Sequence, residues 1–314
     1  MHAIFRSRLA FLLLLAAAAP AILAKAPATG APTLAGDAEA RWIPFTLTPG
    51  NQIRFTMMLD GREVAAILDT GVSDSLLARR SAAVDPARLV GGGSGTAIGG
   101  RVAIAWMPVG TLALGPLTRL GGRLAVAELP ATATGDTHPV DLLVGRDLLA
   151  GHALDIDYPA RRFRILPSGR LPFAGAVAPL AVSPARRVYE SSLTIADRRL
   201  APMVVDTGDG AAVTITAAAW ARAIPPGQRS TTAIAYGLAG PLVTDLTILP
   251  EVRLGTLTAR QVEVRAEPAG GFSAAIGTAG RIGSSFLGRY RVLLDPGAGR
   301  MVLAPSPAAN QPPP

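Results

Sequence analysis

The chain has 314 residues, 49% of them hydrophobic and 17% charged, so it is long enough to bury one large core or two ordinary ones. It contains no cysteine, which excludes disulfides, thiolate metal sites and cysteine nucleophiles. The three histidines (His2, His138 and His152) are too scattered for a metal site, so we expect neither a metal nor a cofactor. The 34 glycines and 27 prolines, with few long helix-period stretches, favour a turn-rich, all-β protein.

The formal net charge of +8 raises the question of a polyanionic partner. Arginines occur only singly or in pairs, and Lys25 is the only lysine. Aromatic residues that could stack on bases make up only 5% of the chain. We therefore interpret the charge as a solvated surface and expect no nucleic-acid partner.

The N-terminus has the pattern of a secretory signal. Arg6 and Arg8 precede the apolar run Leu9–Ala19, and Pro20 and Ala24 suit a cleavage boundary, which predicts a signal peptide over residues 1–24. The alternative is an uncleaved N-terminal anchor, for which the run is short. No later segment approaches membrane-spanning length, so we expect a periplasmic or secreted bacterial protein without a membrane span after cleavage.

Composition divides the rest of the chain. Residues 25–40, rich in Ala, Pro and Gly, and residues 306–314, rich in Pro, are expected to be a disordered leader and tail. Four prolines in Pro167–Pro184 mark an internal boundary. The predicted domains are an N-terminal β lobe over 41–170, a connection over 171–185 and a C-terminal β lobe over 186–305.

The two predicted lobes share an internal repeat. Phe55–Gly71 contains apolar runs, an Asp-Gly turn and an apolar strand that leads into Asp-Thr-Gly, and Ser192–Gly208 has the same layout. An apolar-Gly element follows in each half, at Gly145 and at Gly283. These two landmarks and the later pair Asp157 and Asp295 recur in the same order at spacings of 137 or 138 residues, which makes a chance repeat improbable. Each lobe is expected to consist of short strands and turns.

Further matches support the repeat. Asp157 and Asp295 each stand in a strand-turn context, which favours a hairpin-turn role over catalysis. The glycine-rich segment Gly91–Gly100 predicts a mobile hairpin, and Ala233–Leu249 occupies the equivalent place in the second half.

The duplicated Asp-Thr-Gly sequence supplies the candidate chemistry. A strand end places a carboxylate at a buried loop, glycine permits the tight bend, and threonine can anchor the loop by hydrogen bonding. Two such loops meeting at a pseudo-two-fold axis would bring Asp69 and Asp206 together, and carboxyl groups that close share one proton. The ionised group can act as general base on water, and the protonated group can hydrogen-bond a substrate carbonyl.

On these motifs the sequence resembles the retropepsin-like and pepsin-like aspartic proteases, over most of residues 50–304. The resemblance implies a bilobal acid-protease fold, two β-barrel-like lobes with a cleft between them. It also implies that Asp69 and Asp206 are catalytic and that Gly95–Ala103 forms a flap over the cleft. The residues expected to support the two loops are Thr70, Gly71, Gly145, Thr207, Gly208 and Gly283.

Two features depart from the family pattern. Asp209 follows the second Asp-Thr-Gly where Ser or Thr is usual in pepsin-like enzymes, and the first-lobe flap region contains no tyrosine. Val72, after the first loop, matches the apolar residue of retroviral-type enzymes. We expect a monomeric aspartic endopeptidase acting on a peptide or protein substrate. The alternative is a catalytically inactive peptide-binding or scaffold protein on the same fold.

Other polar residues are given structural roles. Asp147 is interpreted as a cap or loop anchor, and His138 and His152 as loop residues. Trp106 is expected to pack in a strand, with a place in the cleft as the alternative. Ser284-Ser285 lacks the Gly-x-Ser-x-Gly turn and a partner histidine, which argues against a serine hydrolase.

Overall fold

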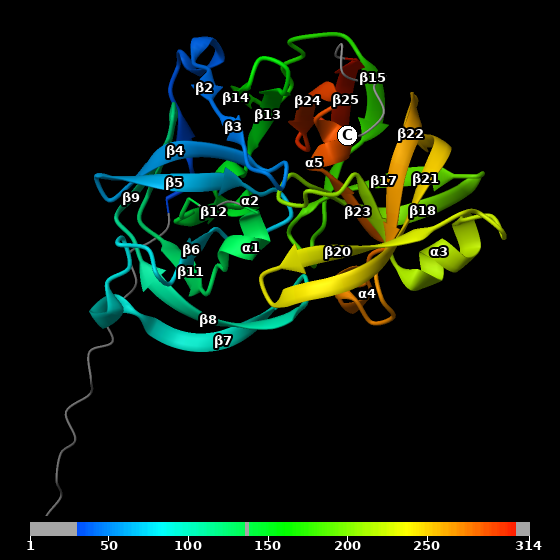
Figure 1. The fold of residues 1–314 in the computed structure, drawn as a ribbon. Helices are drawn as coiled ribbons and strands as arrows, with labels where there is room; N and C mark the ends of the chain where they lie inside the picture. Colours follow the sequence, from blue (N-terminus) through cyan, green and yellow to red (C-terminus); the bar gives the residue numbers. More distant parts are fainter. Residues whose placement is uncertain (1–29, 136–137, 306–314) are drawn as a thin grey trace, which may run out of the picture.

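The computed structural model describes residues 30–135 and 138–305, and over these residues the protein is mostly β, as expected (Figure 1). The expected signal peptide (1–24) and tail (306–314) lie outside the described residues. Within the described ranges, no helix is long and apolar enough to cross a membrane.

Each half of the chain forms a large sheet of its own. The first sheet has 11 strands. They are β1 (Thr33–Leu34), β3 (Thr46–Leu47), β4 (Ile53–Leu59), β5 (Arg62–Leu68), β6 (Leu76–Ala78), β7 (Val90–Ala97), β8 (Gly100–Pro108), β9 (Thr111–Leu114), β10 (Leu117–Leu120), β11 (Arg123–Ala127) and β12 (Leu142–Val144). The second sheet has eight. They are β16 (Ala181–Val182), β17 (Tyr189–Ile195), β18 (Arg198–Asp206), β19 (Val213–Ile215), β20 (Thr231–Gly237), β21 (Gly240–Leu254), β22 (Leu257–Ala266) and β23 (Gly280–Gly283).

A third sheet combines strands from both halves. Its six strands are β2 (Ile43–Pro44), β13 (His152–Asp157), β14 (Arg162–Pro167), β15 (Ala176–Pro179), β24 (Tyr290–Asp295) and β25 (Arg300–Pro305). Helices are few and short. They are the 3₁₀ turns η1 (Ala38–Ala40) and η2 (Pro86–Arg88), and α1 (Ala131–Thr134), α2 (Arg146–Leu149), α3 (Ala217–Ala223), α4 (Phe272–Ala275) and α5 (Ser284–Leu287).

The strand order of the two large sheets repeats. The first runs β4-β5-β12-β6-β11-β8-β7, and the second runs β17-β18-β23-β19-β22-β21-β20. The parallel pairs also correspond, because β5 with β12 and β6 with β11 match β18 with β23 and β19 with β22. The predicted internal repeat is therefore present in the topology as well as in the sequence.

The third sheet has the register of an approximate two-fold axis. β13 and β24 are antiparallel neighbours in which Leu154 pairs with Leu294 and Ile156 pairs with Val292. Gly145 and Gly283 are 138 residues apart, and the same shift takes Leu154 to Val292 and Ile156 to Leu294. The internal repeat therefore maps each of these two cross-strand pairs onto the other. The halves therefore meet around an axis that passes between these strands.

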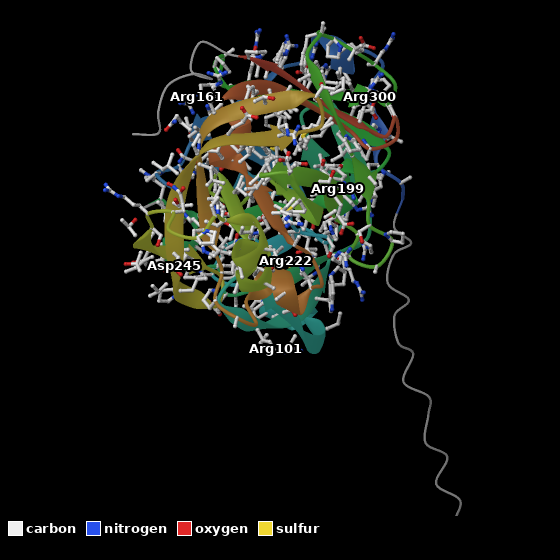
Figure 2. All side chains as sticks on the ribbon, turned by 90° about the vertical axis from the view of Figure 1, so that its right-hand side faces the viewer. Arg101, Arg161, Arg199, Arg222, Asp245 and Arg300 are labelled. Carbon is white, nitrogen blue, oxygen red and sulfur yellow. The ribbon has the colours of Figure 1, made fainter. Side chains whose placement is uncertain are left out.

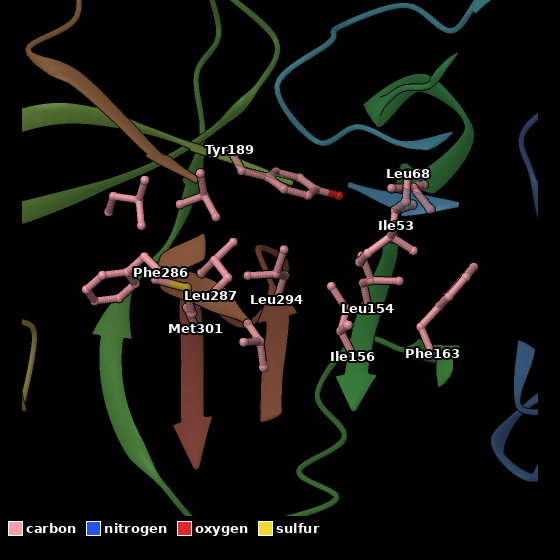
Figure 3. Packing of buried hydrophobic residues seen from close by; sticks show 14 of the residues in the cluster. Ile53, Leu68, Leu154, Ile156, Phe163, Tyr189, Phe286, Leu287, Leu294 and Met301 are labelled. Carbon is pink, nitrogen blue, oxygen red and sulfur yellow. The ribbon is translucent and has the colours of Figure 1, made fainter. Parts of the chain in front are cut away.

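One hydrophobic core extends through both halves. Ile53, Leu154 and Phe163 from the first half belong to the same buried cluster as Phe286 and Leu294 from the second. In Figure 3, Tyr189 of β17 reaches from the second half towards Ile53 and Leu68. Apolar burial therefore fixes the halves against each other in addition to the shared sheet.

The described part of the expected disordered leader is instead structured. β1 adds to the edge of β10 by pairing Thr33 with Thr118, and η1 follows it. Strand addition to an open edge uses backbone groups, so an Ala- and Gly-rich composition does not prevent it. The expected connection over 171–185 likewise contains β15 and β16, which pair with β25 and β17.

Positive charge is distributed over the molecule. The labelled Arg161, Arg199, Arg222 and Arg300 lie well apart in Figure 2. In the third sheet, Arg164 and Arg291 both donate to the fully buried Asp155, at 2.9 and 2.8 Å. Some of the arginine is therefore used to hold the fold together.

Candidate active site

The two Asp-Thr-Gly loops begin at equivalent strand ends. Asp69 directly follows β5 and Asp206 is the last residue of β18. Each of these strands lies parallel to the later apolar strand of its own half, β12 or β23, and Asp69 N–H donates to Val144 O at 3.0 Å. The carboxyl groups are therefore carried on hydrogen-bonded strand ends, and both residues are largely buried.

The loops are joined by a reciprocal set of hydrogen bonds. The Thr70 hydroxyl donates to Val205 O, and the Thr207 hydroxyl donates to Leu68 O, each at 2.7 Å. Each hydroxyl also accepts from the backbone N–H of the other threonine at 3.1 Å. Both threonines are fully buried, so these four bonds fix one loop against the other.

The glycines of the loops allow the carboxyl groups to face each other. A Cβ on Gly71 would overlap the Asp206 carboxyl, and a Cβ on Gly208 would overlap that of Asp69. Each glycine N–H donates to the carboxyl of its own loop, at 3.1 and 3.0 Å. The charge of Asp206 contributes to the raised pKa of Asp69, as expected for carboxyl groups that lie close together. The structure thus brings together the pair expected from the sequence.

Gly145 and Gly283 lie directly behind the two loops. A Cβ on Gly145 would come within 2.8 Å of Val72 O, and one on Gly283 would overlap backbone of the second loop. The next residues donate to the loops, Arg146 N–H to Val72 O at 2.9 Å and Ser284 N–H to Asp209 O at 2.7 Å. Both glycines therefore permit the close backbone contact that supports a loop.

The carboxyl pair has a strongly raised proton affinity. Burial is the main cause that raises the pKa of Asp69 well above its ordinary value, followed by the charge of Asp206 and the hydrogen bond with it. Burial, together with the charge of Asp209, raises the pKa of Asp206 to about 6, while Arg281 acts to lower it. Because burial and mutual repulsion both disfavour two ionised carboxylates, the two groups titrate as a pair that shares a proton.

Asp209, the unusual third acid, is bound to a buried arginine. Arg281 Nε donates to the Asp209 carboxylate at 2.8 Å and lies 3.9 Å from that of Asp206. The same guanidinium pairs with Glu267 and donates to Ser273 Oγ at 2.9 Å. Burial raises the pKa of Asp209, but attraction to Arg281 and hydrogen bonds from Ala211 and Arg281 leave it lowered. Asp209 is therefore an ionised partner of Arg281.

A cavity of about 410 Å³ opens above the carboxyl pair, and both halves line it. The hairpin β7–β8, which contains the expected flap, and the hairpin β20–β21 both contribute to its walls. Their tips meet where Ala239 N–H donates to Ile98 O at 3.1 Å. The sequence predicts both hairpins, but the contact between their tips is visible only in the structure.

Three cavity or network residues were missed by sequence reasoning. Tyr236 lines the cavity from the second hairpin, whereas the sequence predicts a flap only at the first hairpin. Gln52 also lines it and donates to Gly208 O at 2.7 Å. Arg281 stands two residues before Gly283, and its acidic partners are distant in sequence. Aligning the two repeats at Gly145 and Gly283 places Arg281 opposite Leu143, and an arginine in place of a leucine is the signal that could have identified it.

The remaining candidates have structural partners. Asp157 and Asp295 accept turn N–H groups at 3.2 and 3.1 Å, and Asp147 accepts from Ser75 N–H at 2.8 Å. Ser284 and Ser285 donate to backbone carbonyls of the second loop.

The aromatic and imidazole candidates have different surroundings. Trp106 was expected mainly to pack in its strand, but it also lines the cavity, with Arg123 stacked at 4.0 Å from its ring centre. His152, expected in a loop, is instead the first residue of β13, and its Nδ1 lies 2.9 Å from Ala150 O. Over residues 30–135 and 138–305, no cluster of acids and histidines could hold a metal ion.

No protein-family model matches the chain, and no curated protein matches it either. The chemistry of the site therefore has to be inferred from its own geometry.

Replacing Thr70 with Val tests the reciprocal hydrogen bonds. The change keeps the shape but leaves Thr207 N–H and Val205 O without the threonine hydroxyl, at a cost of roughly 1–3 kcal/mol for each buried group left unsatisfied. We expect urea denaturation to show a lower free energy of unfolding. Thr70→Ser keeps the hydroxyl and serves as the matched control, and equal losses in both variants would contradict the assignment.

Replacing Asp69 with Asn tests the burial of the carboxyl pair. The folded pKa is raised above the unfolded value of about 3.9, so the stability that the pair contributes is lost as pH rises from about 4. Asn cannot ionise, and we therefore expect a gain in melting temperature over the wild type that is larger at pH 7 than at pH 4. The exposed Asp245→Asn is the control. A gain that does not depend on pH would rule out this account.

Proposed function

We propose that the protein is an aspartic endopeptidase with a bilobal aspartic-protease fold. The observation that carries the proposal is the pair of buried carboxyl groups, Asp69 and Asp206, which two equivalent and mutually hydrogen-bonded loops bring to the lining of one cavity. The repeated strand order and the reciprocal threonine bonds support the fold assignment. The resemblance of the duplicated motifs to the aspartic proteases agrees with both.

The surrounding charges favour different roles for the two acids. Burial and the charge of Asp209 raise the pKa of Asp206, but Arg281 at 3.9 Å and the Gly208 N–H favour its ionised form. Burial and the charge of Asp206 favour the protonated form of Asp69. Asp206 is then the general base, and Asp69 is the hydrogen-bond donor and acid. Arg281 is a positioning residue in this scheme, because Asp209 and Glu267 hold its guanidinium.

The reaction needs no covalent intermediate. Asp206 takes a proton from a water molecule while the water oxygen attacks the scissile carbonyl carbon. Asp69 donates its proton to the carbonyl oxygen. In the resulting tetrahedral diol, Asp69 takes back a hydroxyl proton and the carbonyl re-forms. The C–N bond breaks as Asp206 passes its proton to the leaving nitrogen. Water is thereby divided between the new carboxyl group and the new amine, and the pair regains its initial protonation.

The walls of the cavity suit an extended peptide. Backbone groups of the two hairpins border the cavity, and strand edges bind peptides through main-chain hydrogen bonds. Apolar side chains such as Ile104, Trp106 and Leu129 line one wall and would contact substrate side chains. A peptide or protein substrate therefore fits better than a small polar metabolite.

The alternative, a peptide-binding protein without catalysis, was motivated by Asp209 and by the absence of a tyrosine from the first hairpin. Asp209 is neutralised by Arg281, and Tyr236 supplies an aromatic side chain from the second hairpin. Both features are therefore compatible with catalysis. Peptide binding without turnover at any pH would favour the alternative.

We further propose that the protein acts as a monomer in the periplasm or outside the cell after signal cleavage. The apolar run Leu9–Ala19 and the boundary at Ala24 support export.

Substitution of either acid with Asn is expected to abolish peptide hydrolysis. Each change removes one half of the acid–base pair, and general acid–base groups contribute about 10²–10⁴-fold in rate. Cleavage of peptide pools by the purified protein, read by mass spectrometry, measures this loss for Asp69→Asn and Asp206→Asn. The exposed Asp245→Asn, on β21, is the control and retains activity. Undiminished cleavage in either dyad variant would reject the mechanism.

The pH dependence of kcat/KM follows from the same charges. Since burial raises the pKa of Asp206 to about 6, the general base is protonated below that pH and activity is lost. The pKa of Asp69 lies well above its ordinary value, so its proton remains available when Asp206 is ionised. We expect kcat/KM to rise about tenfold per pH unit below about pH 6. An optimum at pH 3–4 would contradict the assigned environment.

A further inference from the structure

The repeat identifies which side chains occupy the same place in the two halves. On β12, Leu143 pairs with Ile67, and on β23, Arg281 pairs with Val204. Ile67 and Val204 each stand two residues before the acidic residue of an Asp-Thr-Gly loop. Leu143 and Arg281 are therefore equivalent positions directly beneath the carboxyl pair.

In the first half this place is apolar and open. Leu143 pairs with Leu76, which pairs in turn with Ala125, and the three side chains belong to one hydrophobic cluster. Together with Trp106 and Leu129 they line the cavity of about 410 Å³ that reaches Asp69 and Asp206. The place of Leu143 therefore forms an apolar first-half wall of this cavity, which residues of the second half also line.

In the second half the same place is polar and filled. Arg281 pairs with Thr214, which pairs in turn with Arg265. Arg281 is 4% exposed and is bound by Asp209 and Glu267. The space that remains among these side chains is a separate cavity of about 30 Å³, enough for one or two water molecules. Ile98 and Tyr236 line both cavities, so the two are neighbours.

We propose that the cleft selects substrates with a large apolar side chain on one side of the scissile bond and a small one, such as Ala, Ser or Gly, on the other. This specificity rests on the proposed function, because it assumes that a peptide crosses the carboxyl pair. The approximate two-fold axis places the residues that flank the central bond on opposite halves. Leu143 and Arg281 are then specificity-determining residues, one through an open pocket and the other through an occupied one.

The buried charges around Arg281 disfavour a large apolar substrate side chain at that place in the second half. Such a group would have to displace the ion cluster of Arg281, Asp209 and Glu267 or separate its members, and unpaired buried charges are costly. In the first half it would only cover apolar wall that is already present. A hydrophobic pocket discriminates between substrate side chains that differ by one methylene by about 10–200-fold in kcat/KM.

The test uses two isomeric peptides that cannot be cleaved. In both, the central amide is reduced to CH₂–NH. One carries Phe before that bond and Ala after it, and the other carries Ala before and Phe after. Calorimetry with the full chain is expected to give dissociation constants that differ by at least tenfold, and the preferred isomer shows the direction of the peptide. Equal affinities, or binding of neither isomer, would overturn the inference.

A variant pair assigns the preference to the first-half pocket. Ala133, on α1, lines the large cavity and packs on its hydrophobic cluster, so Ala133→Phe fills the pocket. We expect it to weaken the preferred isomer at least tenfold, whereas Ala131→Phe, at an exposed position of the same helix, leaves the affinity unchanged. An unchanged affinity in folded Ala133→Phe would overturn the assignment, and the wild-type isomer comparison stands even if that variant does not fold.

Cleavage of the unreduced peptides separates this inference from the proposed function. Unequal binding of the isomers without hydrolysis of the preferred one would reject the protease and leave the pocket asymmetry standing. Hydrolysis of both unreduced isomers at equal rates would support the protease and reject the asymmetry.

Discussion

The site depends on four hydrogen bonds made by two buried threonines. Bringing two carboxyl groups together away from water opposes folding, since burial and mutual repulsion both raise their pKa. Thr70 and Thr207 each donate to the opposite half and accept from the opposite loop, and both are inaccessible to solvent. These bonds hold the loops at a fixed separation, so the carboxyl groups meet in spite of the electrostatic cost and the shared proton follows from their position.

The two halves repeat in backbone but differ in charge. The strand order and the loop hydrogen bonds correspond in detail, whereas the buried Arg281 replaces Leu143 and brings Asp209 and Glu267 with it. In a symmetric pair neither acid would be favoured as the proton carrier. Arg281, 3.9 Å from Asp206, removes that equivalence and also fills the place that Leu143 occupies in the first half. One substitution within the repeat therefore affects both proton placement and pocket shape.

The sequence predicts those parts of the site that local patterns determine. Apolar runs ending in Asp-Thr-Gly identified both loops, because strand, bend and carboxylate are consecutive there. Asp209 and Arg281 are 72 residues apart, and they meet only because β23 lies between β18 and β19. Nothing local in Gly-Arg-Ile-Gly indicates that register. β1 was missed for a related reason, since its pairing depends on an open strand edge and leaves no apolar pattern in its own residues.

The floor and the roof of the cavity are held with very different strength. The floor combines the threonine bonds with two parallel strand pairs, whereas the bond from Ala239 N–H to Ile98 O joins the hairpin tips. A backbone hydrogen bond contributes only about 0.5–1.5 kcal/mol net, so separating the tips is a small perturbation. Gly237 lies so close to Ile98 that any side chain there would hold the tips apart. The hairpin tips are therefore less firmly held than the carboxyl pair beneath them.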